Sequence, residues 1–322
     1  MPFFLSSFLA WLHIPDGFLS VIIALVFWLV TAAFVVVAAR RLQADEGGLG
    51  EHQVPLMGIM AAFVFAAQML NFPVAGGTSG HFLGGALTAI MLGPWAGILV
   101  MTAVIAIQAV LFQDGGLLAL GANIFNMGIL TAFIGYGLYR SFAGQKRTVR
   151  WVVAGAAAWL SVMAAAFLTA LQLWLSGTSA LAVVMPAMLG VHALIGIGEA
   201  LITMAALAFI AQIRPDLLGE AAVKERGGRG WVIGGVVLVA LLLLLAPLAS
   251  ADPDGLERVA EDLGFIERGL DAPYTIIPDY TIPFLGETPL STILAGAIGA
   301  VIVGVGAVLL VRALRPFRRS SA

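Results

Sequence analysis

Residues 82–112 read FLGGALTAIMLGPWAGILVMTAVIAIQAVLF, a run of 31 residues without one charged side chain. A helix needs about 20 apolar residues to cross a bilayer, so this run is too long for a single span. It is interrupted by Gly93-Pro94-Trp95. Because proline ends a helix and glycine allows a tight turn, the stretch predicts two transmembrane helices joined at this point.

The rest of the chain follows the same pattern. Seven further apolar segments of spanning length are 18–39, 54–70, 118–139, 151–175, 185–212, 231–249 and 289–311. With 61% hydrophobic and only 11% charged residues, the chain carries more apolar surface than one soluble core could bury. We therefore predict an all-α fold, a polytopic membrane bundle of about nine transmembrane helices in a lipid bilayer.

Basic residues orient the predicted bundle, since loops rich in Lys and Arg stay in the cytoplasm. Arg40 and Arg41 place the C-terminal end of the first helix inside. Alternating sides from there puts fourteen of the sixteen basic residues in cytoplasmic loops. The exceptions, Arg258 and Arg268, lie in the acid-rich external segment 250–288. This asymmetry predicts an N-terminus outside and a cytoplasmic C-terminus.

The loops divide the chain into modules. Residues 1–12 are an N-terminal extension, and residues 13–215 form a seven-helix body. The basic, glycine-rich residues 216–230 are a cytoplasmic linker to a two-helix module, 231–322, which carries the acidic external segment 250–288. Two interpretations of that segment stand: it attracts cations before their capture, or it is a solvated linker that orders the loops around a site.

Composition and motifs exclude several classes of protein. Without any cysteine, the chain has no disulfides, thiolate metal sites or thiol nucleophiles, so a metal site would use His, carboxylate, Met or backbone atoms. It also lacks the phosphate loop of ATPases and the His-Glu-x-x-His motif of metallopeptidases. We expect no enzymatic activity, no organic cofactor and no nucleic-acid partner.

Two of the four histidines lie at the predicted outer face. His13 precedes the turn signal Pro15-Asp16-Gly17. An imidazole near a free chain terminus can bind a metal with the terminal amine and a backbone nitrogen, a planar set that suits Ni²⁺ or Cu²⁺. His81 ends the glycine-rich segment 71–81, a compact turn that could dip into the bundle and line a site. Taken alone, each histidine has another interpretation: His13 as an ordinary turn residue, and His81 as a surface-loop residue that caps the next helix.

The other two histidines receive different interpretations. His192 and Glu199 are seven positions apart, which places them on one helix face two turns apart. Ionisable residues inside a span indicate function by default, while a structural hydrogen-bonding pair is the alternative. His52, beside Arg41 and Glu51, is expected to be a solvated residue of a cytoplasmic loop.

Four segments together resemble the CbiM/NikM family, the cobalt and nickel substrate-binding subunits of energy-coupling-factor transporters. They are HIPDGFL (13–19), QMLNFPVAGGTSGH (68–81), FQDGGLLALGAN (112–123) and HALIGIGE (192–199). The resemblance covers residues 13–215. The motif PDGLE (253–257) and the final helix are similar to the small CbiN/NikN-type partner subunit, here fused.

The resemblance implies a function and a site. The chain would be the substrate-binding subunit of an ATP-driven importer in a bacterial or archaeal inner membrane, capturing Co²⁺ or Ni²⁺ at the outer face. Its partners would be a membrane coupling subunit and ATPase subunits, and the fused module favours nickel. The implied ligands are position 12, His13 and His81, with supporting residues Asn71, His192 and Glu199. The alternative is a stand-alone secondary permease, although the spans carry few ionisable relays.

Position 12 departs from the family pattern, in which the chain begins with Met at that place. Here it is Leu12, preceded by eleven residues, so no free amine stands beside His13. One explanation is a cleaved signal peptide, but residues 1–12 have no basic n-region. A second is a genuine extension, which would remove the amine ligand. We favour a third explanation, in which translation starts at a leucine codon decoded as Met, so that Leu12 supplies the terminal amine.

Overall fold

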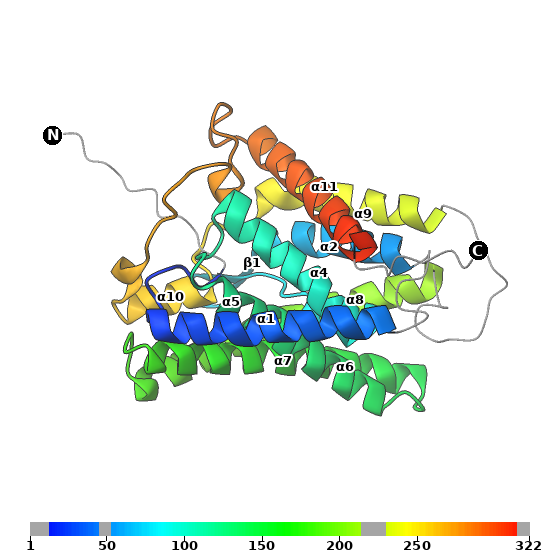
Figure 1. The fold of residues 1–322 in the computed structure, drawn as a ribbon, viewed down its shortest axis with the longest axis horizontal. Coiled ribbons are helices and arrows are strands. Elements are labelled where there is room, and N and C mark those ends of the chain that lie inside the picture. The colour runs from blue at the N-terminus through cyan, green and yellow to red at the C-terminus, as the bar shows by residue number, and fades with distance from the viewer. Residues whose placement is uncertain (1–12, 45–52, 214–229, 314–322) are drawn as a thin grey trace, which may run out of the picture.

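The computed structural model describes residues 13–44, 53–213 and 230–313 (Figure 1). Helices dominate it. In chain order the helices and strands are α1 (Val21–Ala44), α2 (Gln53–Gln68), β1 (Phe72–Val74), β2 (Thr78–Gly80), α3 (Gly85–Leu92), α4 (Pro94–Ile107), α5 (Leu120–Ile124), α6 (Thr131–Ser141), α7 (Arg147–Leu175), α8 (Leu181–Ile213), α9 (Gly230–Leu245), α10 (Gly255–Asp262) and α11 (Pro289–Ala313). Short π-helical turns extend α4 (η1, Gln108–Phe112) and join α5 to α6 (η2, Phe125–Leu130).

Every predicted apolar segment falls on a helix. Six helical stretches are long and apolar enough to cross a membrane: Val21–Ala44, Pro94–Phe112, Leu120–Ser141, Arg147–Leu175, Leu181–Gln212 and Pro289–Ala313. Two more, Gln53–Gln68 and Val232–Leu248, are apolar but shorter. The described residues therefore form a multi-pass, mostly helical membrane protein, and the predicted count of nine spans is not confirmed.

The predicted break inside residues 82–112 is confirmed. Helix α3 ends at Leu92, Gly93 has φ 82°, and Pro94 begins α4. The N–H of Gly93 donates to the Ala89 carbonyl at 2.9 Å, which closes the turn. However, α3 has only eight residues, all of them buried. At about 1.5 Å per residue it is about 12 Å long, well short of a bilayer core of about 30 Å, because residues 81–84 before it are not helical.

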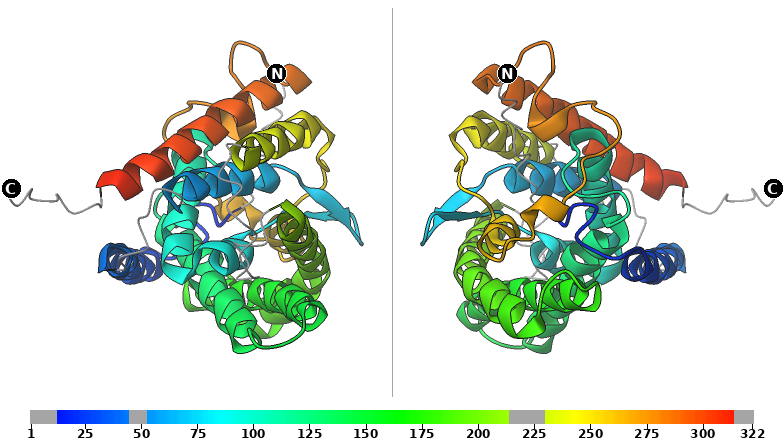
Figure 2. Two further views of the ribbon diagram at one scale, coloured as in Figure 1. Left: turned by 90° about the vertical axis from the view of Figure 1, so that its right-hand side faces the viewer. Right: turned by 90° about the vertical axis from the view of Figure 1, so that its left-hand side faces the viewer.

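The helices pack in two groups that meet at α3 and α4 (Figures 1 and 2). In one group the long helices α7 and α8 pair, and α6 packs between α7 and α3. In the other, α9 and α11 of the C-terminal module pack on α2. The α2–α11 contact is close because it is lined by glycine: a Cβ on Gly58 would lie 2.9 Å from the Gly304 carbonyl oxygen.

The glycine-rich segment after α2 is a β-hairpin, which is the exception to the all-α prediction. Strands β1 and β2 pair antiparallel, with Val74 opposite Thr78. Gly76 and Gly77 at the tip have φ of 82° and 67°, a conformation that glycine adopts without strain. Figure 2 shows the hairpin projecting from the side of the bundle, while its base, Thr78 to Gly80, is buried. The predicted compact turn is thus confirmed as a hairpin that leads His81 inward.

The described basic residues gather at the two ends of the bundle as the charge pattern predicts. The end formed by the C-termini of α1, α6 and α11 and the N-terminus of α7 carries Arg40, Arg41, Arg140, Lys146, Arg147, Arg150 and Arg312. The opposite end, where α10 lies (Figure 1), carries Arg258 within α10 and Arg268 in the short turn that follows it. Which end faces the cytoplasm stays a prediction.

Candidate metal centre

The segment that carries His13 is held by two hydrogen bonds to one amide side chain. The N–H of Ile14 donates to Oδ1 of Asn123, and Nδ2 of Asn123 donates to the Ile14 carbonyl, both at 3.0 Å. The turn predicted at Pro15-Asp16-Gly17 follows, with Gly17 at φ 90°. Oδ1 of Asp16 accepts from the Ala119 N–H at 2.9 Å. Residues 13–17 are therefore fastened to α5 and to the loop that connects η1 to α5.

The imidazole of His13 is buried and has one nitrogen bonded and one unbonded. Nδ1 lies 2.7 Å from Oδ1 of Asp114, whereas Nε2 is buried with no hydrogen-bond partner among the described residues. Burial would raise the pKa of Asp114, but the adjacent His13 and the hydrogen bonds from His13 and Tyr280 hold it below its usual value. Since an ionised carboxylate only accepts, Nδ1 of His13 carries a proton, and in the neutral imidazole Nε2 then presents its lone pair.

His81 lies opposite His13, with the ring centroids 5.7 Å apart. The C-terminal module fastens the strand before it: the N–H of Ser79 donates to the Pro253 carbonyl and its hydroxyl to the Asp252 carbonyl, both at 2.8 Å. Each histidine is thus delivered by a separate loop. The two loops meet only in the folded chain, and each loop touches the module.

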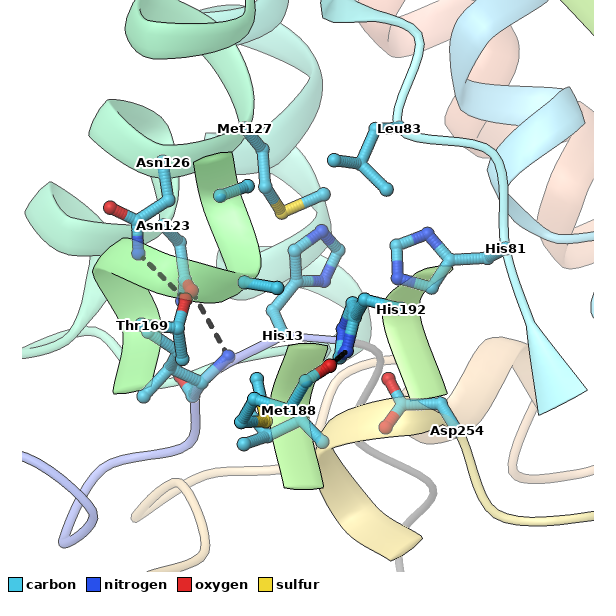
Figure 3. A pocket seen from close by; sticks show the side chains of 14 residues that line it. His13, His81, Leu83, Asn123, Asn126, Met127, Thr169, Met188, His192 and Asp254 are labelled. Carbon is cyan, nitrogen blue, oxygen red and sulfur yellow. Dashed lines mark hydrogen bonds between the residues drawn. The ribbon is translucent and has the colours of Figure 1, made fainter. Parts of the chain in front are cut away.

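The two imidazoles face a small cavity of about 60 Å³ (Figure 3). Its wall is formed by His13, Ile14, His81, Leu83, Asn123, Asn126, Met127, Ala165, Ala166, Thr169, Met188, His192, Asp254 and Leu256. This volume is enough for an ion or a few water molecules and too small for an organic substrate. Among the described residues, no three His, Asp or Glu side chains stand close enough to hold an ion between them.

The C-terminal module closes one side of this cavity with the start of α10. Asp254 caps that helix by accepting from the Glu257 N–H at 2.7 Å, and its carboxyl group lines the cavity. Burial, together with repulsion from Asp114, raises the pKa of Asp254 to about 6. A Cβ on Gly255 would lie 2.9 Å from Cε1 of His192, so the lack of a side chain at position 255 lets α10 approach the His192 ring closely.

The predicted supporting residues separate into three roles. His192 lines the cavity, with Nδ1 bonded to the Met188 carbonyl at 2.8 Å. Glu199 is buried, and its carboxylate accepts from the N–H groups of Leu83 and Gly84 at 2.6 and 3.0 Å. The two residues are therefore not bonded to each other, contrary to the pairing considered from sequence. Asn71 does not line the cavity, and its carbonyl accepts from the Ser250 N–H at 2.8 Å.

Leu12 lies outside the described residues, so the predicted amine ligand has no structural counterpart here. One feature of His13 does bear on it. A chelate that includes the backbone nitrogen of a histidine closes through Nδ1, and here Nδ1 bonds to Asp114. The structure therefore presents His13 for binding through Nε2.

Sequence reasoning missed four residues that shape the site: Asp114, Asn123, Asp254 and Tyr280. Asp114 and Asn123 lie within the family-like segment 112–123, so the signal was present without a role attached. Asp254 belongs to the PDGLE motif, which had been assigned only to the fused module. Nothing local in the sequence singles out Tyr280.

Replacing Asn123 by alanine should loosen the His13 segment. The change leaves the buried N–H of Ile14 without a partner, which costs about 1–3 kcal/mol, while the Ile14 carbonyl keeps its hydrogen bond from the Gly116 N–H. We expect at least a tenfold loss of nickel affinity in Asn123→Ala, measured by competition with a coloured chelator. The exposed Gln145, at the opposite end of the bundle, supplies the control: Gln145→Ala should bind like the parent. Equal affinities of the two variants would contradict the assigned role.

The chain matches two family models. Residues 13–217 match CbiM, described as the cobalt uptake substrate-specific transmembrane region, and residues 228–316 match the PDGLE domain. A protein of Archaeoglobus fulgidus named as fused nickel transport protein NikMN is 38% identical over 91% of this chain and 95% of its own length. The fused nickel transport protein NikMN of Rhodobacter capsulatus is 30% identical over 94% of this chain and 99% of its own.

A solved structure agrees with the fold. The crystal structure of a truncated transition metal transporter is 36% identical, with a TM-score of 0.56, and aligns over 62% of this chain and 99% of its own. The arrangement of 62% of this chain is thus shared with a transition metal transporter.

Proposed function

Since the chain belongs to the CbiM family of cobalt uptake transmembrane regions, joined to a PDGLE domain, we propose that it is the substrate-binding subunit of an energy-coupling-factor importer for Ni²⁺ or Co²⁺. In this role it captures the ion at the outer face of the membrane. The membrane coupling subunit and the ATPases that drive transport are separate proteins.

One observation carries the proposed site: the buried, unpartnered Nε2 of His13 faces His81 in a cavity of ionic size. A buried nitrogen without a partner is costly, so its retention favours a ligand that supplies the missing contact. Imidazole nitrogen binds nickel and cobalt well. The second ring nitrogen of a metal-binding histidine commonly forms a hydrogen bond with a carboxylate, as Nδ1 of His13 does with Asp114.

Nickel is the favoured cargo. Both relatives above that extend over the two modules are named nickel transport proteins. For given nitrogen and oxygen ligands, divalent affinity also rises from cobalt to nickel. Binding of both ions to the purified chain measures this preference directly.

Uptake of radioactive nickel tests the coupling to ATPases. We expect cells without nickel importers to take up nickel when this chain is produced with its coupling subunit and ATPases, and to take up background amounts with the chain alone. The physical reason is that the chain has no phosphate loop to use ATP. A matched strain with an inactive ATPase keeps the whole complex while removing its energy source. Full uptake by the chain alone would identify it as a stand-alone secondary permease.

A further inference from the structure

Tyr280 inserts its ring from the C-terminal module into the seven-helix body. It belongs to a short 3₁₀ turn, Pro278–Tyr280, between α10 and α11. Its ring stacks on Phe112, with centroids 4.6 Å apart and planes at 18°, and also approaches Phe65 at 6.0 Å. Asp279 and Tyr280 have φ of 47° and 55°, a region that residues other than glycine rarely adopt. Such a backbone persists only where surrounding contacts impose it.

The hydroxyl of Tyr280 ends a buried chain of hydrogen bonds that leads to the cavity. It accepts from Nε2 of Gln108 at 3.2 Å and donates to Oδ2 of Asp114 at 2.7 Å. The other oxygen of Asp114 accepts from Nδ1 of His13 at 2.7 Å. Asp114 thus bonds Tyr280 through one oxygen and His13 through the other, which fixes the plane of its carboxylate.

The stack and the hydroxyl are separable in their effects. Stacking on Phe112 buries the Tyr280 ring and would hold the module in place with phenylalanine at this position as well. The hydroxyl takes no part in that stack. It donates a hydrogen bond to the second carboxylate oxygen of Asp114, the residue that orients His13. The neighbouring Tyr274 offers a contrast, because its hydroxyl is buried without a hydrogen-bond partner among the described residues.

We propose that Tyr280 is a positioning residue of the metal site, which acts through Asp114 to hold the His13 imidazole with Nε2 towards the cavity. The C-terminal module then sets the affinity of the seven-helix body for its ion. This inference rests on the proposed function, since it assumes that His13 is a metal ligand.

The test compares Tyr280→Phe with Tyr274→Phe in the full-length chain. Both changes remove one buried tyrosine hydroxyl from the same module, and only the first touches Asp114. Loss of a direct outer partner of a metal ligand typically lowers affinity 10–100-fold, and Tyr280 lies one hydrogen bond further out, beyond Asp114. We therefore expect a severalfold weaker binding of Ni²⁺ in Tyr280→Phe and unchanged binding in Tyr274→Phe. Thermal unfolding of the metal-free variants checks that both remain folded.

Two further measurements separate positioning from module docking. If Tyr280 acts through Asp114, the double variant Asp114→Asn with Tyr280→Phe should bind no more weakly than Asp114→Asn alone. At saturating Co²⁺, where affinity no longer matters, the visible absorption of the bound ion should also change in Tyr280→Phe and not in Tyr274→Phe.

The outcomes are distinct. Parental affinity in Tyr280→Phe, additive losses in the double variant, or an unchanged Co²⁺ spectrum would each overturn the inference while leaving the proposed function in place. If the parental chain itself binds neither ion, the proposed function fails instead.

Discussion

Replacing His13 or His81 by alanine is expected to lower the affinity for Ni²⁺ about 100-fold or more. Structural zinc sites with four ligands release about 10–16 kcal/mol on binding, which is roughly 3 kcal/mol for each ligand and sets the scale for one imidazole. A loss of that size corresponds to about two orders of magnitude in the dissociation constant. Each imidazole is buried and lines the cavity. The third histidine in the cavity wall, His192, already has Nδ1 bonded to the Met188 carbonyl.

The measurement is equilibrium binding of Ni²⁺ and Co²⁺ to the purified variants. His52→Ala serves as the matched control, because the sequence places His52 in a loop on the opposite side of the membrane from His13 and His81. His192→Ala adds a third comparison: His192 lines the cavity with Nδ1 already bonded to its own helix, so we expect a smaller loss. Full affinity in both His13→Ala and His81→Ala would show that the ion binds elsewhere.

Replacing Glu199 by alanine should damage both the fold and the site. The carboxylate accepts the N–H groups of Leu83 and Gly84, which lie between His81 and the start of α3. A buried donor left unpaired costs about 1–3 kcal/mol, and the loss of this side chain leaves two buried N–H groups unpaired. We expect a clear drop in thermal stability of several degrees or more, together with weaker nickel binding because His81 loses its fixed backbone.

Glu199→Gln separates the contributions of the two hydrogen bonds, since glutamine retains one acceptor oxygen. Its thermal stability and nickel affinity should fall between those of the parent and Glu199→Ala. The exposed Glu287 is the control for loss of a carboxylate as such. If Glu199→Ala unfolds at the same temperature as Glu287→Ala and binds nickel equally well, the carboxylate is not the anchor of this segment.

The helices could be predicted from the sequence because their signals are local. Apolar runs of about 20 residues fix most of the bundle, and Gly93-Pro94 marks the one break inside a run. The shortness of α3 was not visible, since residues 82–92 are as apolar as any spanning helix. A tertiary contact shortens it: Glu199 stabilises the non-helical backbone before α3 by accepting from Leu83 and Gly84, which lie more than a hundred positions earlier in the chain.

The site was predictable as far as single residues carried motifs. His13 and His81 stood out because each follows or precedes a turn signal, and the structure brings them together. The groups that orient them could not be inferred, because a hydrogen bond such as Tyr280 to Asp114 joins positions 166 residues apart and leaves no periodic trace in the sequence. The amine predicted at Leu12 lies outside the described residues and stays a prediction.

Helix α3 also bears on the ion permeability of a membrane that contains this chain. The 19 residues from Pro94 to Phe112 lead from the end of α3 back to the loop of Asp114, and all eight residues of α3 are buried. Its buried residues are apolar except for Thr88, whose hydroxyl donates to the Gly84 carbonyl. Moving even one unit of charge into such surroundings costs on the order of 20 kcal/mol in the idealised limit. A cell that makes this chain without its partners should therefore keep its resting membrane potential.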